Sequence, residues 1–233
     1  MQRNIYNQLL RWKNKKKRKP LILNGARQVG KTYILREFGQ KEYQKVAFFS
    51  LDRDQKVREV FEKSGSTADI LMALSAISQV DITPGDTLLV LDEIQDCPKA
   101  LEALKFFCEE TPDIHIVVAG SLLGLSLHDG TSYPVGKVEE MRLYPMTFLE
   151  FLNAMGKTQL VEIIENKKWA VVNMLQMELI GLLRQYYYVG GMPAAVRAHV
   201  EHNSLQEIRS IQLQILADYR RDFSKHAPAR EVP

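Results

Sequence analysis

The chain has 233 residues, of which 45% are hydrophobic and 25% are charged. This length holds one large domain or one medium and one small domain, and the composition excludes a disordered chain, a collagen-like repeat and a disulfide-stapled miniprotein. The net charge of +3 depends on residues 13–19, which contain six basic residues and no acidic one. Without them, 25 basic residues face 28 acidic ones, so the charge makes no strong case for a nucleic-acid-binding protein.

The rest of the composition is typical of a soluble cytoplasmic protein. Cys97 and Cys108 are its two cysteines, a usage typical of a reducing compartment. The first residues lack the apolar segment of a signal peptide. The sequence also contains no run of 18 apolar residues, which a membrane-spanning helix would need. We expect the basic run at residues 13–19 to be a solvated loop between the first helix and the first strand; contact with nucleic acid or polyphosphate is the alternative.

Short apolar runs alternate with segments of helical periodicity up to about residue 147, a pattern typical of a parallel sheet covered by helices. We expect strands at residues 21–24, 46–51, 87–92, 114–119 and 138–143. Between them we expect one helix from Lys31 with Gly39 as its stop, one capped by Ser66, and one with Pro98 in its first turn that ends at residues 111–113.

Beyond residue 147 the expected elements are all helical, at residues 148–155, 161–184, 194–202 and 204–223. The sequence therefore predicts an α/β core over residues 1–146 and a helical region over residues 147–233.

One segment after the first expected strand fits the pattern G-x-x-x-x-G-K-[ST] at every position. It consists of Gly25, Ala26, Arg27, Gln28, Val29, Gly30, Lys31 and Thr32, with Tyr33 next to it. Such a loop between a strand and a helix surrounds an anion with backbone N–H groups at the positive end of the helix. We expect these residues to bind a nucleotide, with Lys31 at the β- and γ-phosphates and Thr32 as a Mg²⁺ ligand.

Two carboxylates, Asp92 and Glu93, end the buried strand at residues 87–92. At this edge of a parallel sheet Asp92 is placed to hold Mg²⁺, and Glu93 to polarise a water that attacks the γ-phosphate. A surface turn is the alternative for this pair alone. Ser121 follows the next strand and is a candidate sensor of the γ-phosphate or of the attacking water. The alternative role, N-cap of a helix at residues 122–127, is compatible with sensing. Gln95 is a further candidate for the site.

The nucleotide class follows from one motif that the sequence lacks and one residue that it contains. A GTPase needs Asn-Lys-x-Asp, and the nearest segment, Asn166-Lys167-Lys168-Trp169, has Trp in place of Asp. A nucleotide kinase usually lacks the second acid, here Glu93. Hydrolysis of ATP is therefore favoured.

Five blocks now stand in an order typical of a known family. They are residues 25–32 (a Walker A motif), 91–95 (a Walker B motif), 120–124, 143–151 and 190–193. The chain resembles a prokaryotic group of AAA+-superfamily ATPases related to the signal-transduction ATPases with numerous domains. The resemblance implies a P-loop NTPase three-layer sandwich with a central parallel sheet, followed by a helical or winged-helix lid. It also implies that the strands ending at Asp92 and Ser121 flank the phosphate-loop strand.

The resemblance implies one further contact with the nucleotide, and the sequence departs from the family's pattern at two points. Pro193, in the turn Gly191-Met192-Pro193, would lie against the nucleotide; without the family this turn is a helix stop followed by a helix start. The family usually has Arg before the fifth strand, at a position that is a candidate to supply a charge to the γ-phosphate. This sequence has Lys137 there, a point charge without the planar guanidinium. The family usually continues into a nuclease-like domain, so we expect this chain to end before a further C-terminal domain.

Three hypotheses about function remain open at this stage. The first is a Mg²⁺-dependent ATPase whose hydrolysis moves the lid. The second is a slow ATP/ADP switch that regulates a protein partner through residues after 146. The third, ATP-driven action on nucleic acid, depends on the basic run at residues 13–19 alone. If the site is shared in a homo-oligomer, Arg220 and Arg221 are candidates for a donated charge.

Overall fold

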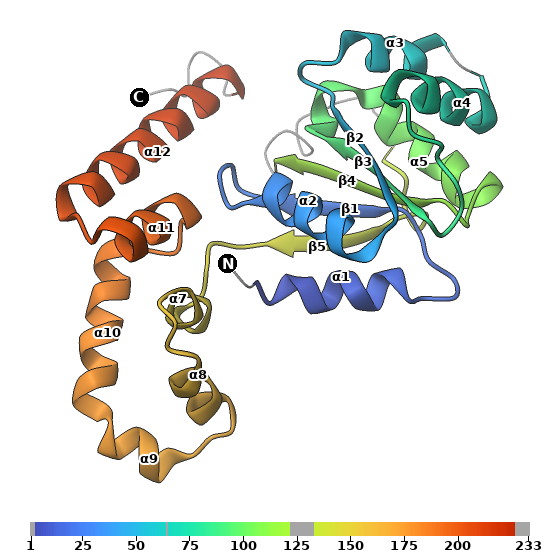
Figure 1. The fold of residues 1–233 in the computed structure, drawn as a ribbon. Helices are drawn as coiled ribbons and strands as arrows, with labels where there is room; N and C mark the ends of the chain where they lie inside the picture. Colours follow the sequence, from blue (N-terminus) through green and yellow to red (C-terminus); the bar gives the residue numbers. More distant parts are fainter. Residues whose placement is uncertain (1–2, 64, 122–132, 227–233) are drawn as a thin grey trace. The chain divides into compact units, whose positions relative to one another are not determined.

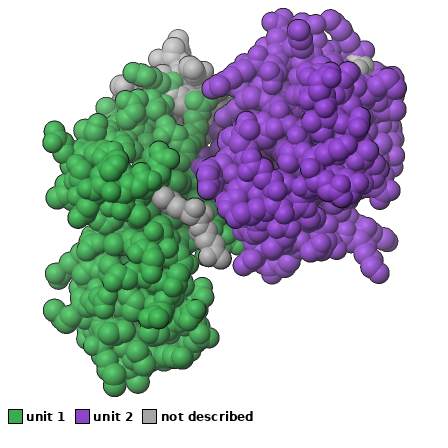
Figure 2. Space-filling model, viewed as in Figure 1, with its two compact units in different colours: residues 1–4, 27–29, 144–233 green, residues 5–26, 30–143 purple. Residues whose placement is uncertain are grey.

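The computed structural model of the chain describes residues 3–63, 65–121 and 133–226. The chain divides into two compact units (Figures 1 and 2). The core unit consists of residues 5–26 and 30–143, and the helical unit consists of residues 1–4, 27–29 and 144–233. In the described ranges no helix combines the length and the apolar character needed to cross a membrane.

The core unit is built on a five-stranded sheet in which every pair of neighbours is parallel. The strands are β1 (Leu21–Gly25), β2 (Lys45–Ser50), β3 (Thr87–Asp92), β4 (His115–Ser121) and β5 (Glu139–Leu143). Their order in the sheet is β2-β3-β4-β1-β5. The parallel sheet confirms the predicted α/β class, and all five predicted strands are present with ends that differ by at most two residues.

The prediction of which strands flank the phosphate-loop strand is partly wrong. β4 and β5 flank β1, with Gly25 opposite Ser121 on one side and opposite Leu143 on the other. β3, which ends at Asp92, pairs with β2 and β4 instead. A strand that is buried on both faces carries an apolar run with no signal for which strand lies beside it, so the order was not predictable from the residues.

Helices cover both faces of the sheet (Figure 1). They are α1 (Ile5–Lys13), α2 (Lys31–Glu42), α3 (Gln55–Lys63), α4 (Thr67–Ser78) and α5 (Pro98–Glu110), with a short 3₁₀ helix, η1 (Ile94–Asp96). Alternate residues of a strand point to opposite faces. Leu89 and Leu91 therefore pack into the apolar cluster with α3, α4 and α5, whereas Leu88 faces α2. This burial holds the strand ends in fixed positions.

The helix ends agree with the sequence at α4 and α5 and differ at α2. Ser66 caps α4 by accepting a hydrogen bond from the Asp69 N–H at 3.1 Å, and Pro98 lies in the first turn of α5, as predicted. Gly39 does not stop α2, which continues to Glu42. A Cβ at Gly39 would lie 2.8 Å from Val46 Cγ2, so this glycine permits the close packing of α2 on β2.

The helical unit contains six helices in residues 144–226. They are α7 (Phe148–Ala154), α8 (Thr158–Glu165), α9 (Trp169–Met174), α10 (Gln176–Val189), α11 (Pro193–His202) and α12 (Leu205–His226). The helix expected over residues 161–184 is interrupted twice, near Lys167, whose φ is +53°, and at Leu175. No strand occurs between residues 144 and 226, so this region is helical and lacks the strands of a wing.

At the turn between α10 and α11 one helix ends and the next begins, as the sequence predicts. Gly190 has a φ of +74°, and the main chain of Gly191 lies directly against that of Met146. The Met146 N–H donates to the Gly191 carbonyl oxygen at 2.7 Å. A Cβ at Gly191 would lie 2.3 Å from the Met146 carbonyl oxygen, so only glycine fits.

We expect Gly191→Ala to destabilise the helical unit by about 1–3 kcal/mol or more, because the clash is with backbone and no side chain can move aside. The measurement is urea unfolding of the full chain followed by circular dichroism. Gly181→Ala is the matched control: Gly181 lies within α10 with no atom near its missing Cβ, so alanine there is expected to be neutral or stabilising. Equal stability of the two variants would contradict the close contact between the backbones of Gly191 and Met146.

Candidate functional site

The segment predicted to bind phosphate connects β1 to α2. Gly25 ends the strand and Lys31 begins the helix. Gly30 is the N-cap of α2 with a φ of +97°, a conformation that a residue with a Cβ rarely adopts, and it gives no side-chain cap to the first turn. The N–H groups of that turn therefore point to the position where an anion is stabilised by the helix dipole.

The side chain of Lys31 contacts the backbone of the phosphate-binding segment and is buried. Its ammonium group donates to the carbonyl oxygens of Gly25 at 2.9 Å and Ala26 at 3.0 Å. The side chain is 7% exposed, so a positive charge is held at the carboxyl end of β1. A Lys in this position supplies a point charge to an incoming phosphate.

Thr32 and Asp92, the two predicted metal ligands, lie in contact. The Thr32 hydroxyl donates to Asp92 Oδ2 at 2.6 Å, although the two residues come from α2 and β3. Burial raises the pKa of the Asp92 carboxyl above its usual range, while the hydrogen bond from Thr32 opposes that shift. A carboxylate and a hydroxyl are hard oxygen donors of the kind that Mg²⁺ prefers, so the donor set fits this cation.

Glu93, Gln95 and Ser121 form a short polar chain beside Asp92. Glu93 has a φ of +54° and is the N-cap of η1, which turns the chain away from the end of β3. Gln95 Nε2 donates to Glu93 Oε2 at 2.7 Å, and the Ser121 N–H donates to Gln95 Oε1 at 3.4 Å. The structure thus brings together the predicted water-activating and sensor residues through Gln95. The helix expected at residues 122–127, with Ser121 as its cap, lies outside the described residues.

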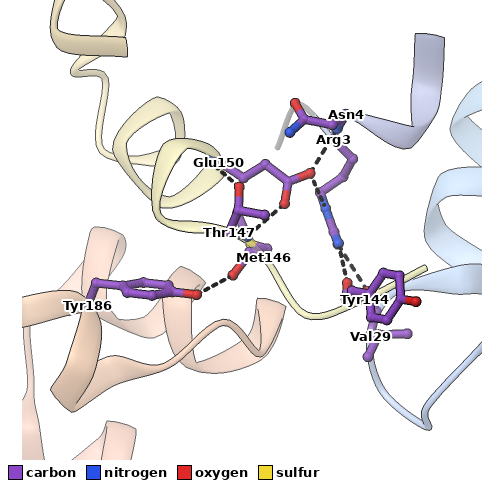
Figure 3. A network of polar contacts seen from close by, with 8 residues as sticks. All are labelled: Arg3, Asn4, Val29, Tyr144, Met146, Thr147, Glu150 and Tyr186. Carbon is purple, nitrogen blue, oxygen red and sulfur yellow. Dashed lines mark hydrogen bonds and ion pairs between the residues drawn. The ribbon is translucent and has the colours of Figure 1, made fainter. Parts of the chain in front are cut away.

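Within the helical unit, three contacts hold the tip of the phosphate loop. The Tyr219 hydroxyl donates to the Arg27 carbonyl oxygen at 2.8 Å, and Gln28 Nε2 donates to Asp218 Oδ2 at 2.9 Å. Arg3 Nη1 donates to the Val29 carbonyl oxygen at 3.0 Å (Figure 3). Sequence reasoning missed these partners of the loop, because they lie far from it along the chain and no motif marks them.

Arg3 also belongs to a buried network at the start of α7 (Figure 3). Its Nε atom lies 3.1 Å from Glu150 Oε1, and both side chains are about 5% exposed. Glu150 also accepts from the N–H groups of Asn4 and Thr147, both at 2.8 Å, and its own N–H donates to the Thr147 hydroxyl in a capping box. Arg3 Nη2 donates to the Tyr144 carbonyl oxygen at 2.6 Å. This network connects the first residues, the loop tip and α7.

The remaining predicted site residues are Tyr33, Pro193, Arg220 and Arg221. Tyr33 is exposed in the first turn of α2, and Pro193 begins α11 in the helical unit. Arg220 and Arg221 lie on the exposed side of α12, where Arg221 is 3.8 Å from Asp218. The roles of Tyr33, Pro193, Arg220 and Arg221 stay predictions.

Lys137 lies at the wrong edge of the sheet for a charge directed at the phosphates of its own chain. It precedes β5 at the edge where the parallel strands begin, and its ammonium group pairs with Glu109 Oε1 at 2.8 Å. Gly25, Asp92 and Ser121 end their strands at the opposite edge.

The parallel sheet, covered by helices on both faces, is the fold of the P-loop NTPases. A family model described as an AAA domain matches residues 17–152, and one described as a domain of unknown function matches residues 180–233. Because the first model covers more than half of the sequence, the chain belongs to the AAA domain family. Membership supports nucleotide binding and ATP hydrolysis as the activity of this class of protein.

A comparison with solved structures found similar chains at low sequence identity, and the first of them shows the fold. The Walker-type ATPase of Pyrococcus abyssi superposes with a TM-score of 0.53 at 15% identity, over 96% of this chain and 77% of that one. RuvB of Thermotoga maritima has a TM-score of 0.43 at 20% identity, over 68% of this chain and 52% of that one. A comparison with curated proteins found no match.

Proposed function

We propose that the chain binds Mg-ATP at the carboxyl edge of its sheet and hydrolyses it. The observation that carries the proposal is the 2.6 Å contact between the Thr32 hydroxyl and Asp92, next to the buried ammonium group of Lys31. These are the residue types that a nucleotide site needs for a metal and a phosphate chain. In this proposal residues 1–146 are the ATPase domain and residues 147–233 are its lid.

Each residue then has a defined role. The N–H groups of residues 25–32 surround the phosphates, and Lys31 exchanges its two carbonyl partners for phosphate oxygens. Thr32 and Asp92 hold Mg²⁺, which, when bound, neutralises charge on the phosphate oxygens. Glu93 accepts a proton from the attacking water, and Ser121 is positioned to sense the γ-phosphate.

The proposal includes coupling of the loop to the helical unit. The backbone of the loop tip is held by Tyr219 and by Arg3, so a nucleotide that reshapes the tip changes contacts in that unit. Pro193 would add a contact from the lid. The free thiols of Cys97 and Cys108 support a cytoplasmic location.

The second candidate is a slow ATP/ADP switch whose output is a contact with a protein partner. The same hydrogen bonds at residues 27–29 favour it, because they connect the loop to α12 without requiring fast turnover. The two candidates differ in how activity depends on concentration. An ATPase with a shared site gains activity per chain as it assembles, and a monomeric switch does not.

We expect Lys31→Ala to weaken ATP binding by about tenfold to a hundredfold, because a charge-assisted hydrogen bond to phosphate contributes about 1.5–3 kcal/mol. The measurement is titration of the full chain with a fluorescent ATP analogue in the presence of Mg²⁺. Lys56→Ala is the control, since Lys56 is an exposed lysine on α3 and its removal changes the net charge equally. Unchanged affinity in Lys31→Ala would exclude this loop as the nucleotide site.

A further inference from the structure

An open hollow of about 680 Å³ lies in the core unit, at the edge of the sheet where the strands begin. Residues 16–19, here called the basic segment, line one side of it. Gly85 and Asp113, from the loops that precede β3 and β4, line the other. β1 begins directly after the basic segment and ends at Gly25, so the hollow and the candidate nucleotide site lie at opposite ends of this strand, roughly 15 Å apart.

The basic segment brings four positive charges to this hollow. Two earlier lysines of the same run already have acidic partners: Lys13 pairs with Glu42, and Lys15 pairs with Glu139. Among the described residues, no carboxylate forms an ion pair with any member of the basic segment. Asp113 is the one carboxylate among the lining residues described, so the positive charge is in excess.

Arg18 is the member of the segment best placed to bind an anion. Its guanidinium group is half-buried, lies 5.6 Å from the centre of the Trp12 ring and donates one hydrogen bond, to the Lys13 carbonyl oxygen at 3.1 Å. Burial lowers the pKa of Arg18, while the nearby carboxylates of Asp113 and Glu139 oppose that shift. A guanidinium has five N–H groups in a planar fork, so several remain for an acceptor such as phosphate.

The wall that carries the segment is fixed in position. The fully buried Trp12 donates from Nε1 to the Lys19 carbonyl oxygen at 2.9 Å, and the Lys19 ammonium group donates to the Gly136 carbonyl oxygen at 2.6 Å. His115, which also lines the hollow, is hydrogen-bonded to the Tyr43 hydroxyl at 2.7 Å. Its burial lowers its pKa to about 4, so this imidazole is neutral at pH 7. The hollow is therefore part of the folded core unit.

We propose that this hollow binds a small anion that carries two or more phosphate groups. Its volume lies in the range of small-ligand sites, and its excess charge matches a short phosphate chain. A nucleic acid fits less well. The aromatic ring beside the segment, Trp12, is buried and unable to stack on a base, and the sequence outside residues 13–19 is net acidic.

The test is calorimetric titration of inorganic tripolyphosphate, without Mg²⁺, into the full-length Lys31→Ala protein, in which phosphate binding by the loop between β1 and α2 is weakened. We expect one binding event per chain that weakens as salt is added. Lys16→Ala combined with Lys17→Ala should weaken this binding about tenfold, since two of the exposed positive charges that attract the anion are removed. Arg18→Gln should also weaken it. Lys56→Ala combined with Lys105→Ala removes the same net charge from exposed lysines elsewhere in the core unit and should leave binding within about twofold.

Three results would overturn the proposal. The first is no binding of tripolyphosphate to the Lys31→Ala protein, and the second is an equal loss in the control double variant, which would indicate a general charge effect. The third is binding of a single-stranded oligonucleotide that tripolyphosphate does not displace, which would make this face a nucleic-acid surface. The proposed ATP site is tested separately, because its variants lie at the other edge of the sheet.

Discussion

Glu93→Gln is expected to bind ATP with unchanged affinity and to hydrolyse it at least about a hundredfold more slowly, because a positioned general base contributes about 10²–10⁴-fold to rate. Glutamine keeps the size of the side chain and its contact with Gln95, but it does not take a proton from water. The left-handed backbone at Glu93 holds this side chain beside the end of β3, next to Asp92. The measurement is phosphate release at saturating Mg-ATP, together with a binding titration.

Glu62→Gln is the matched control for this prediction. Glu62 is exposed on α3, so the same change of charge is expected to leave hydrolysis unaltered. If Glu93→Gln releases phosphate at the wild-type rate, Glu93 is not the base.

Glu150→Ala is expected to cost about 3–5 kcal/mol of stability, because it leaves the buried guanidinium of Arg3 without its carboxylate. It also leaves the N–H groups of Asn4 and Thr147 without their acceptor. Arg3→Ala should have an effect of similar size, and the double variant should lose much less than the sum of the two. The measurement is denaturant unfolding of all three variants and the wild type.

An exposed ion pair in the same unit provides the comparison. Lys157 and Glu178 lie 3.3 Å apart, with both side chains more than 40% exposed, so Lys157→Ala should cost less than about 1 kcal/mol. Equal costs for the two pairs would mean that burial does not determine the contribution of the Arg3–Glu150 pair.

The strands and the contact between Thr32 and Asp92 were predictable because their signals in the sequence are local. β3 is a run of six buried residues ending in Asp92, and the pattern of glycines, Lys31 and Thr32 occurs in a single segment. Parallel strands place their carboxyl ends at one edge, so the contact of Thr32 with Asp92 followed from the fold class.

Features that depend on distant residues were not predictable in the same way. Arg3 and Glu150 lie 147 residues apart, and neither has a neighbour in sequence that marks a buried charge. α3 was missed because it buries only Val57 and Phe61, which is too short an apolar stripe for a periodic pattern. The position of β4 between β3 and β1 was missed for a different reason, since all three strands are apolar on both faces.

The most direct test of the central claim is steady-state phosphate release from Mg-ATP by the full chain, over a hundredfold range of protein concentration, with Lys31→Ala as the blank. We expect release by the wild type to exceed the blank and to stop when Mg²⁺ is chelated. Activity per chain that rises with concentration would indicate a site shared between copies, and constant slow release would favour the switch. Wild-type release equal to that of Lys31→Ala at every concentration would contradict the proposal that this chain is an ATPase.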